Sequence, residues 1–591
     1  MKFHSACRYL SDMLFLLGDE KRKLPFIAAI FLLASILDLA GVGFVGAYIT
    51  LFTQPQGSEL SFLEPIFRQL GILGDVSGKT MLVLGLILVV VFLIKAIVGL
   101  LVQRIIFSFC YRRLAYLRTS VIGAIQCMPY SSFIQRNSSE YVQTVINYVG
   151  QYTGSLRYLL ILISEGIVAI VLFFLLSWVS GFALAVVIAI GVIMIVGYDK
   201  IFRHKLTSAG HTLNMGNQLT IRGVQEGAAG FKEIRILGQE SYFLEQVRKG
   251  SWLVAKSNMF ILVVQAIPRY MVEVAIIAFV VSLVAIMVLR GQSIESTYPV
   301  IGMLAVALLR LGPITKLIMT STASLRANRP GIKLLRKEFD YLGSIPLKTK
   351  DDLVRTLEPF ESLELKNVSF TYDKSPLAAL SNISMSIVAG ESIGLVGQSG
   401  SGKTTLVDVF LGLLGNQSGE VFYNGVPLHE KLASWRGNVA YLPQEVFMID
   451  DSLRNNVCLG RENGDSHDEQ LEKAIAQAQL SNLISDLPNG VDTQLGELGT
   501  RLSGGQRQRV ALARAFYHQR EVLVLDEATS ALDTDTEREI VDEMQRLKGS
   551  VTMIVIAHRL STLQHCDRIY KLERGEIIGV GSYKEMIGGK K

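Results

Sequence analysis

Hydrophobic and polar positions divide the chain into two halves with different patterns. Six apolar stretches in the first half are each of the length needed to cross a bilayer, about 20 helical residues. They lie near residues 25–52, 80–102, 158–178, 182–198, 259–289 and 297–320. Two polar segments between them, 103–157 and 199–258, contain proline only at position 129. We therefore expect a membrane domain whose helices extend beyond the bilayer and turn back at tips near 130–135 and 227–234.

The first 24 residues form a separate element in this pattern. Tyr9, Leu10, Met13, Leu14 and Leu17 fall on one face of a helix, which favours an amphipathic helix lying along the membrane surface. The segment lacks the continuous apolar core and the small-residue cleavage site of a signal peptide. The alternative is a cytoplasmic extension that does not contact the membrane.

The second half has the pattern of an α/β domain. After a linker at 321–360, strand-like residues alternate over 363–370, and short apolar runs occupy 392–396, 522–525 and 552–556. Runs of this length bounded by polar turns are typical of buried strands. We expect a soluble α/β domain over 361–591.

Charge and composition support this division. Half of the 591 residues are hydrophobic and 19% are charged. Residues 1–320 carry 27 Lys and Arg against 16 Asp and Glu, whereas 321–591 carry 31 against 36. The net charge of +6 is no argument for nucleic acid, and five widely spaced cysteines indicate neither disulfides nor zinc. Lys and Arg are concentrated in 1–24, 103–157 and 199–258, which predicts that both termini are cytoplasmic.

Several charged residues interrupt the apolar stretches. Charges inside a bilayer are costly and are functional candidates by default. One hypothesis is a cavity in which Lys95, Arg269 and Arg310 meet an anionic headgroup such as a phosphate or pyrophosphate. The alternative is structural pairing: Arg269 and Glu273 are spaced i,i+4, and Arg310 and Lys316 can equally pair with Asp38 or Glu165.

A phosphate-binding loop follows the apolar run at 392–396. The pattern is a glycine-rich loop ending in lysine and a hydroxyl residue, between a strand and a helix. Its glycines allow backbone N–H groups to surround phosphates, the lysine reaches the β- and γ-phosphates, and the first threonine hydroxyl binds Mg²⁺. The loop comprises Gly397, Gln398, Ser399, Gly400, Ser401, Gly402, Lys403, Thr404 and Thr405.

Two further apolar runs lead into polar residues. Asp526 ends the second run and can hold Mg²⁺ opposite the phosphate loop, and Glu527 beside it can polarise the attacking water. The third run leads to His558, although a lone histidine after a strand is more often structural than catalytic. Together with the loop, these residues indicate a nucleotide hydrolase.

The segment 502–506 resembles the signature sequence of ATP-binding cassette (ABC) transporters, and the family's other motifs appear around it in order. Tyr372 resembles the aromatic residue that stacks on adenine, Gln444 the glutamine that contacts Mg²⁺, residues 530–533 the D-loop, and His558 the γ-phosphate histidine. Six spans fused to one cassette resemble an exporter half-transporter, which implies ATP and Mg²⁺ as ligands. The resemblance also implies a homodimer, with a heterodimer as the alternative, in which the signature contacts the partner's ATP. Its residues are Ser503, Gly504, Gly505 and Gln506.

Two local segments bear on what is moved. Residues 36–44 and 267–273 resemble flippases of lipid-linked oligosaccharides, which implies a polyprenyl-pyrophosphate-linked substrate. The expected location is the bacterial inner membrane, because the chain looks bacterial and shows no organellar transit segment. The alternative is a multidrug, lipid or peptide exporter. Six spans argue against the soluble cassette ATPases, and a gated sensor or channel would not need Glu527.

Overall fold

The computed structural model describes residues 2–53, 78–179, 181–289, 298–343, 358–372, 375–460, 465–526, 542, 545–556 and 560–586. The chain forms two compact units. Unit 1 contains residues 1–128 and 136–346, and unit 2 contains residues 129–135 and 347–591. The predicted fold class, a helical membrane domain followed by an α/β domain, is confirmed.

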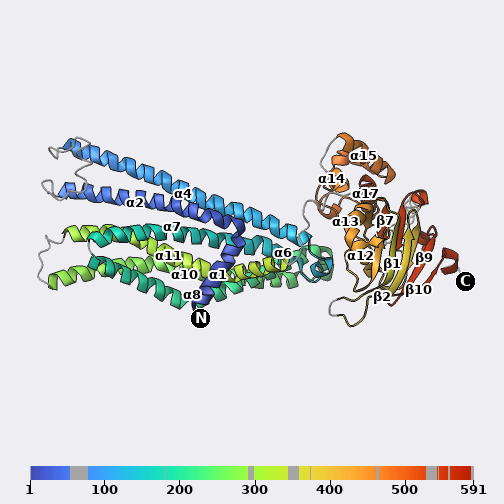
Figure 1. Cartoon of the computed structure of the whole chain (residues 1–591), viewed down its shortest axis with the longest axis horizontal. Helices are drawn as coiled ribbons and strands as arrows, with labels where there is room; N and C mark the ends of the chain where they lie inside the picture. The colour runs from blue at the N-terminus through green and yellow to red at the C-terminus, as the bar shows by residue number, and fades with distance from the viewer. Residues whose placement is uncertain are drawn as a thin grey trace. The chain divides into compact units, whose positions relative to one another are not determined.

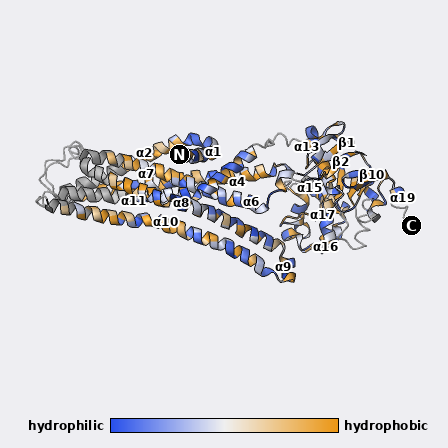
Figure 2. Ribbon diagram, turned by 90° about the horizontal axis from the view of Figure 1, so that it is seen from below, coloured by the Kyte–Doolittle hydropathy of each residue, from blue (hydrophilic) through white to orange (hydrophobic). Residues whose placement is uncertain are grey.

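Unit 1 is built from long helices (Figure 1). The described residues of each predicted span lie within one of these helices: α2 (Leu24–Thr53), α4 (Gly78–Gln126), α7 (Val149–Val179), α8 (Gly181–Ala229), α10 (Glu240–Leu289) and α11 (Tyr298–Gly343). At 1.5 Å per residue, 49-residue helices such as α4 and α8 are about 74 Å long, well over twice the hydrocarbon thickness. Colouring by hydropathy shows the polar extension of α10 toward α9 (Phe231–Leu237) (Figure 2).

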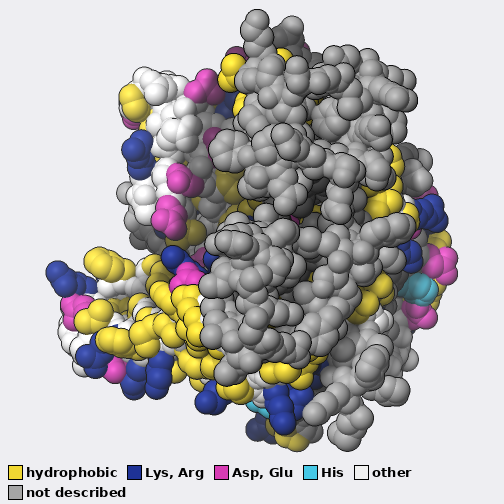
Figure 3. All heavy atoms as spheres, turned by 90° about the vertical axis from the view of Figure 1, so that its left-hand side faces the viewer, with side chains coloured by type: hydrophobic (Ala, Val, Ile, Leu, Met, Phe, Trp, Pro, Cys, Tyr) yellow, Lys and Arg dark blue, Asp and Glu magenta, His cyan; other side chains and the backbone are white. Residues whose placement is uncertain are grey.

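Among the described residues, three segments meet a length and hydropathy criterion for membrane spans: Gly85–Gln126, Ser138–Ile170 and Glu240–Phe279. The outward face of α4 is apolar, with Leu82, Leu86 and Leu93 all more than half exposed. Hydrophobic side chains also lie at the surface when unit 1 is viewed along its helices (Figure 3). A surface this apolar needs lipid around it.

The helices of unit 1 pack closely at small residues. α8 packs along α10 and α11, α7 along α11, and α2 along α4 and α7. Where α8 crosses α10, a Cβ added to Gly216 would lie 2.8 Å from the carbonyl oxygen of Gly250, and one added to Gly250 would lie 2.9 Å from that of Gly216. Glycine is therefore required on both sides of this crossing.

The N-terminal segment forms α1 (Lys2–Leu17) followed by the 3₁₀ turn η1 (Gly18–Lys23), and α1 runs across the long helices in Figure 1. Met13, Leu16 and Leu17 are buried against unit 1, whereas Leu10 and Leu14 are exposed. The predicted helix is therefore present. The residues that it buries lie nearer its C-terminal end than the predicted apolar face does.

The tips of the helical extensions lie where the sequence predicts them. The first is the short helix α5 (Tyr130–Phe133), followed by α6 (Ser138–Gln143) and a π-helical turn, η2 (Thr144–Tyr148). The second is the turn at Gly230 between α8 and α9. The first tip, residues 129–135, belongs to unit 2, where Tyr130 packs against the hydrophobic core.

The prediction that 321–360 forms a linker is wrong for its first 23 residues. Residues 321–343 continue α11, and Ile332, Leu335 and Leu342 are buried in the core of unit 1. The composition of this stretch is polar, but its apolar residues recur at helical spacing and cover one face.

The described residues of unit 2 form two sheets. An antiparallel sheet has the order β2-β1-β4-β5, and the larger sheet has the order β10-β9-β3-β8-β7-β6, with all pairs parallel except β10 with β9. The strands are β1 (Ser362–Phe370), β2 (Leu380–Val388), β3 (Ser392–Val396), β4 (Ser418–Tyr423), β5 (Val426–Pro427), β6 (Val439–Leu442), β7 (Val522–Asp526), β8 (Thr552–Ile556), β9 (Arg568–Glu573) and β10 (Glu576–Gly581). The predicted runs at 392–396, 522–525 and 552–556 are β3, β7 and β8.

The helices of unit 2 lie against these sheets and in a separate helical layer (Figure 1). They are α12 (Lys403–Phe410), α13 (Leu428–Asn438), α14 (Leu453–Cys458), α15 (Asp465–Gln477), α16 (Ser481–Asp486), α17 (Gly504–Tyr517) and α19 (Tyr583–Met586), with 3₁₀ turns η5 (Gly490–Asp492), η6 (Glu497–Gly499) and η7 (Leu560–Leu563). One hydrophobic cluster fills the space between the two sheets and α12, and a second lies under α14, α15 and α17.

Trp435 anchors the first of these clusters. It is fully buried between Phe360 and Tyr423, with ring centroids 5.8 and 5.7 Å away, and its indole N–H donates to the Phe410 carbonyl at 2.6 Å. Trp435→Phe should lower the local free energy of unfolding by about 2 kcal/mol, because the carbonyl at the end of α12 loses its buried donor. Hydrogen exchange of the α12 and β4 amides measures this change. Trp252→Phe, at an exposed position on α10, is the control, and equal exchange in both variants would contradict the prediction.

Candidate functional site

The phosphate loop connects β3 to α12 in the conformation that its glycines allow. Gly400 and Gly402 have φ of +78° and +101°, a region that other residues rarely adopt. A Cβ on Gly402 would also lie 2.6 Å from the Ala379 carbonyl oxygen. The backbone therefore comes so close to the start of β2 that no side chain fits there.

Lys403 begins α12 and is held across the loop. It is only 7% exposed, and its Nζ donates to the carbonyl oxygens of Gly397 at 2.8 Å and Gln398 at 3.0 Å. These bonds fix the ammonium group inside the loop, next to the backbone N–H groups that open α12. Helix N–H groups and a fixed cation together favour a bound phosphate.

A cavity of about 770 Å³ lies above this loop. Its wall combines the loop with the end of β1 and the end of β7. Tyr372 lies edge-on to Phe370 with ring centroids 5.0 Å apart, and its hydroxyl is 3.2 Å from Thr405 Oγ1. The predicted residues that line the cavity are Tyr372, Ser399, Gly400, Gly402, Lys403, Thr404, Thr405 and Asp526.

Asp526 lines the inner edge of the cavity, and a second carboxylate, Asp408, lies near it behind the cavity wall. Burial, and then the neighbouring Asp526, raise the pKa of Asp408 on α12 to about 6. Tyr441 donates from its hydroxyl to Asp526 Oδ2 at 2.9 Å, and burial and then Asp526 raise the pKa of Tyr441 above its usual value. The tyrosine therefore stays protonated, while two carboxylates repel one another in a partly buried position that a cation would stabilise.

The residues present fit Mg²⁺ bound together with phosphate. Thr404 and Asp526, a hydroxyl and a carboxylate, line the same cavity, and Mg²⁺ prefers oxygen ligands supplied partly by substrate phosphates. Within the described part of the chain, no cluster of three or more His, Cys, Asp or Glu could hold a metal without such help.

The signature residues lie at the start of α17, outside the cavity wall. Ser503 is the N-cap: its hydroxyl accepts from the Gln506 N–H at 3.3 Å, and Gln506 Oε1 accepts from the Ser503 N–H at 2.8 Å. Gly504 and Gly505 form the first turn. This capping box leaves Ser503 exposed at the N-terminus of a 14-residue helix. Gln444 is likewise exposed after β6 and does not line the cavity.

Some predicted site residues stabilise the loop and do not line the cavity, and others lie outside the described residues. Ser401 and Gln398 shape the loop backbone, since the Ser401 N–H donates to the Gln398 carbonyl at 3.1 Å. Glu527, residues 530–533 and His558 lie outside the described residues, so their roles stay predictions.

Sequence reasoning missed one wall of the cavity. Arg574 and Gly575, at the turn between β9 and β10, line it together with Ser381. The Ser381 N–H donates to the Gly575 carbonyl, and the Gly575 N–H donates to the Ser401 carbonyl at 3.0 Å. The local Arg-Gly pattern indicates only a turn, because the loop it touches is more than 170 residues away.

Two of the three membrane candidates, Lys95 and Arg269, have described side chains, and each contacts a residue of its own helix. Arg269 pairs with Glu273 at 3.1 Å, as the structural alternative predicts, and both are more than half exposed. The Lys95 ammonium lies 5.2 Å from the ring centre of Phe92 on α4. The side chain of Arg310 lies outside the described residues.

A strand, a phosphate loop and a helix under an aromatic wall define a P-loop nucleotide-binding domain, here joined to a helical membrane domain. Two family models match: the ABC transporter transmembrane region over 27–307 and the ABC transporter domain over 380–530. The chain is 31% identical to the "ATP-dependent lipid A-core flippase" of Escherichia coli K12 over 572 residues, 93% of each chain. It is 36% identical to the protein of that name from a Polaromonas species over 372 residues, 62% of this chain and 61% of that one.

A solved structure of a bacterial Atm1-family ABC exporter with ATP bound has the same fold. Its TM-score is 0.77 at 21% identity, and the alignment covers 97% of this chain and 96% of that one. The chain belongs to the ABC transporter family. It is a multi-pass membrane protein in which one ATP-binding domain drives translocation.

Proposed function

We propose that this protein flips an amphipathic lipid with an anionic sugar headgroup across the bacterial inner membrane, as a homodimer with cytoplasmic termini. The observation that carries the proposal is similarity to lipid A-core flippases along 93% of the chain, through both units. Among such lipids, a polyprenyl-pyrophosphate-linked oligosaccharide is the candidate favoured by residues 36–44 and 267–273.

In this proposal ATP occupies the 770 Å³ cavity. Tyr372 stacks on the adenine, and the phosphate loop with Lys403 holds the phosphates. Thr404, Asp526 and Gln444 bind Mg²⁺. The exposed N-terminus of α17 is available to the γ-phosphate bound by a second copy, since its N–H groups and helix dipole favour an anion. This explains why Ser503 and Gly504 are separate from the chain's own cavity.

Arg269 is the proposed contact for the anionic headgroup. Its ion pair with Glu273 is exposed, so it adds little stability and can be exchanged for a stronger anion. A pyrophosphate offers several oxygens to the planar guanidinium, which binds such groups through paired hydrogen bonds. Lys95 and Arg310 are proposed to take part from α4 and α11.

The proposal predicts a specific lipid response. In nanodiscs, a polyprenyl-pyrophosphate-linked oligosaccharide should change ATPase activity saturably, and Arg269→Ala should raise the half-maximal concentration about tenfold through one lost charge-assisted contact. Basal ATPase activity should be unchanged, because Arg269 belongs to unit 1, whereas the residues that line the nucleotide cavity all belong to unit 2.

Arg222→Ala is the matched control, because Arg222 forms the same type of exposed i,i+4 pair with Glu226 on α8. Lipid A-core is titrated in parallel, because the relatives are named lipid A-core flippases. A response only to neutral lipids or hydrophobic drugs would refute the anionic-lipid proposal and favour a multidrug or lipid exporter. Loss of basal ATPase activity in Arg269→Ala alone would favour a purely structural ion pair.

A further inference from the structure

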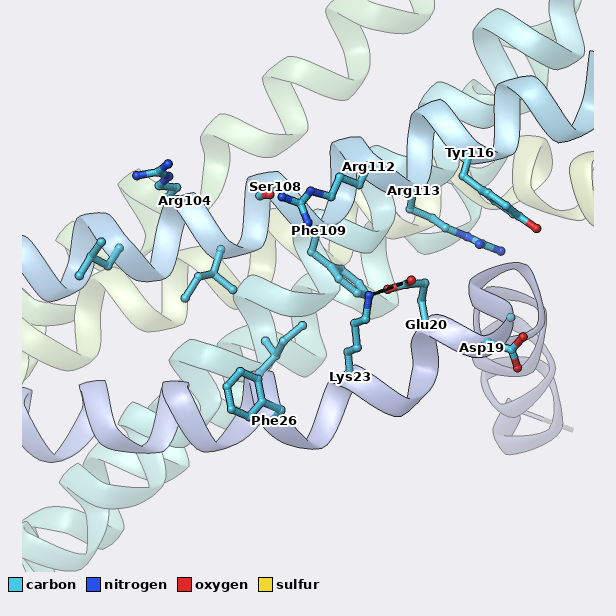
Figure 4. Close-up of a pocket in the computed structure, with 14 residues that line it drawn as sticks. Asp19, Glu20, Lys23, Phe26, Arg104, Ser108, Phe109, Arg112, Arg113 and Tyr116 are labelled. Carbon is cyan, nitrogen blue, oxygen red and sulfur yellow. Dashed lines mark hydrogen bonds and ion pairs between the residues drawn. The ribbon is translucent and has the colours of Figure 1, made fainter.

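A second cavity, of about 750 Å³, lies in unit 1 where η1 and the start of α2 meet α4 (Figure 4). It is held in shape by Arg113, whose Nε and Nη2 donate to the Leu16 carbonyl at 3.0 and 2.5 Å. Gly18, with φ +56°, turns the chain directly beside this guanidinium. The cavity is therefore framed by the fastening of the N-terminal segment to α4.

The cavity carries an excess of positive charge. Four cationic side chains, Lys23, Arg104, Arg112 and Arg113, line it together with two acidic ones, Asp19 and Glu20. Lys23 and Glu20 form an ion pair at 2.8 Å, and Arg113 is occupied by the Leu16 carbonyl.

Arg104 and Arg112 remain available to a ligand. Within the described part of the chain, neither makes a hydrogen bond or an ion pair. They lie eight residues apart on α4, with Ser108 midway, so all three share one helix face and the arginines are about 12 Å apart along the axis. Figure 4 shows the Arg112 side chain extending toward Ser108 and Phe109.

Apolar residues make up the other side of the cavity. Leu101, Ile105 and Phe109 form a second line on α4, one residue removed from Arg104 and Ser108. Leu101 is 50% exposed, and Phe26, on α2, is 72% exposed. A ligand that satisfies both sides must have an anionic head and a hydrophobic body.

The position along α4 places this cavity at the membrane boundary. The apolar stretch of α4 ends at Val102, and Arg104 is its first charged residue beyond Lys95. Headgroup phosphates lie at this depth and acyl chains lie just beyond it. Basic pockets between membrane helices bind anionic lipid headgroups in this way.

We infer that this cavity binds an anionic phospholipid of the leaflet next to the helical extensions, with its phosphate between Arg104 and Arg112 and its acyl chains against Phe26 and Leu101. Free phosphate is a poorer ligand, because exposed arginines are screened by salt and the apolar side would stay uncovered. The site is distinct from the proposed transport contact at Arg269 on α10, and it does not depend on which lipid is transported.

Native mass spectrometry of the full chain in detergent tests this inference. Phosphatidylglycerol, phosphatidylcholine with the same acyl chains, and inorganic phosphate are titrated separately. We expect phosphatidylglycerol to bind tightest, and Arg104→Gln with Arg112→Gln to weaken its first binding step about tenfold. Lys205→Gln with Lys256→Gln removes the same charge from α8 and α10, outside the cavity, and should leave that step unchanged.

Ser108→Glu provides a second variant that removes no contact. A glutamate midway between the arginines is spaced i,i+4 from each, so it should pair with them, preserve the helix and weaken phosphatidylglycerol binding. Equal binding of phosphatidylcholine, binding of phosphate alone, or equal loss in the control variant would each overturn the site. ATPase activity retained in all variants shows that they are folded.

Discussion

Replacing Glu527 by glutamine should lower the steady-state rate of ATP hydrolysis by about a hundredfold or more, the usual contribution of a general base. Glu527 directly follows Asp526, which ends β7 at the inner edge of the nucleotide cavity. Glutamine has the same shape but cannot accept the proton of the attacking water. ATP binding should be unchanged, because the phosphate loop and Tyr372 are untouched.

The two effects are measured separately, as phosphate release at saturating ATP and as equilibrium binding of ATP. Glu576→Gln, an exposed carboxylate on β10 outside the cavity wall, is the control. Glu527→Gln should also accumulate as an ATP-bound closed dimer. This is detectable as an ATP-dependent change in crosslinking between copies at Ser503. Hydrolysis at the normal rate would show that another group activates the water.

The sequence predicts the membrane helices and the strands β1, β3, β7 and β8 of unit 2, because these depend on local patterns. The apolar runs that become β3, β7 and β8 are short, buried on both faces and bounded by polar turns, which is the arrangement that parallel strands require. The phosphate loop is predictable for the same reason: its glycines, lysine and threonine are contiguous.

Features that depend on distant contacts could not be predicted in this way. Arg574 and Gly575 reach the nucleotide cavity only because β9 pairs with β3, which the sequence between them does not specify. The extension of α11 past position 320 is similar, since Ile332 and Leu335 are recognised as core residues only when the rest of unit 1 covers them.

Charged residues in the membrane half show the same limit. The i,i+4 spacing of Arg269 and Glu273 predicts their ion pair, which the structure contains. By contrast, Arg104 and Arg112 lie in a polar stretch whose charges indicate only topology. Their availability to a ligand becomes visible when η1 and the start of α2 pack beside them.

The architecture of the phosphate loop leads to the second large effect. Lys403→Ala should weaken ATP binding about a hundredfold, because two charge-assisted hydrogen bonds to the phosphates are lost. Its ammonium already donates to the carbonyls of Gly397 and Gln398, so the free loop also loses the cation that fixes its shape. Hydrolysis at low ATP concentration should fall at least as much as binding does.

Lys571→Ala is the control, because Lys571 lies on β9 beside the strand that precedes the loop, and its side chain is exposed.

Lys403→Arg separates the effect of charge from that of shape. Position 403 is 7% exposed, so a guanidinium does not fit without moving the loop, and we expect arginine not to restore the affinity for ATP. The affinity for ATP is measured at equilibrium on each of the three purified variants. Since Lys403→Ala weakens ATP binding and Glu527→Gln blocks only turnover, crosslinking between copies should need about a hundredfold more ATP in the first variant and persist with ATP in the second. If both variants bound ATP equally well, the lysine would not be a phosphate ligand, and the cavity would hold the nucleotide through backbone N–H groups alone.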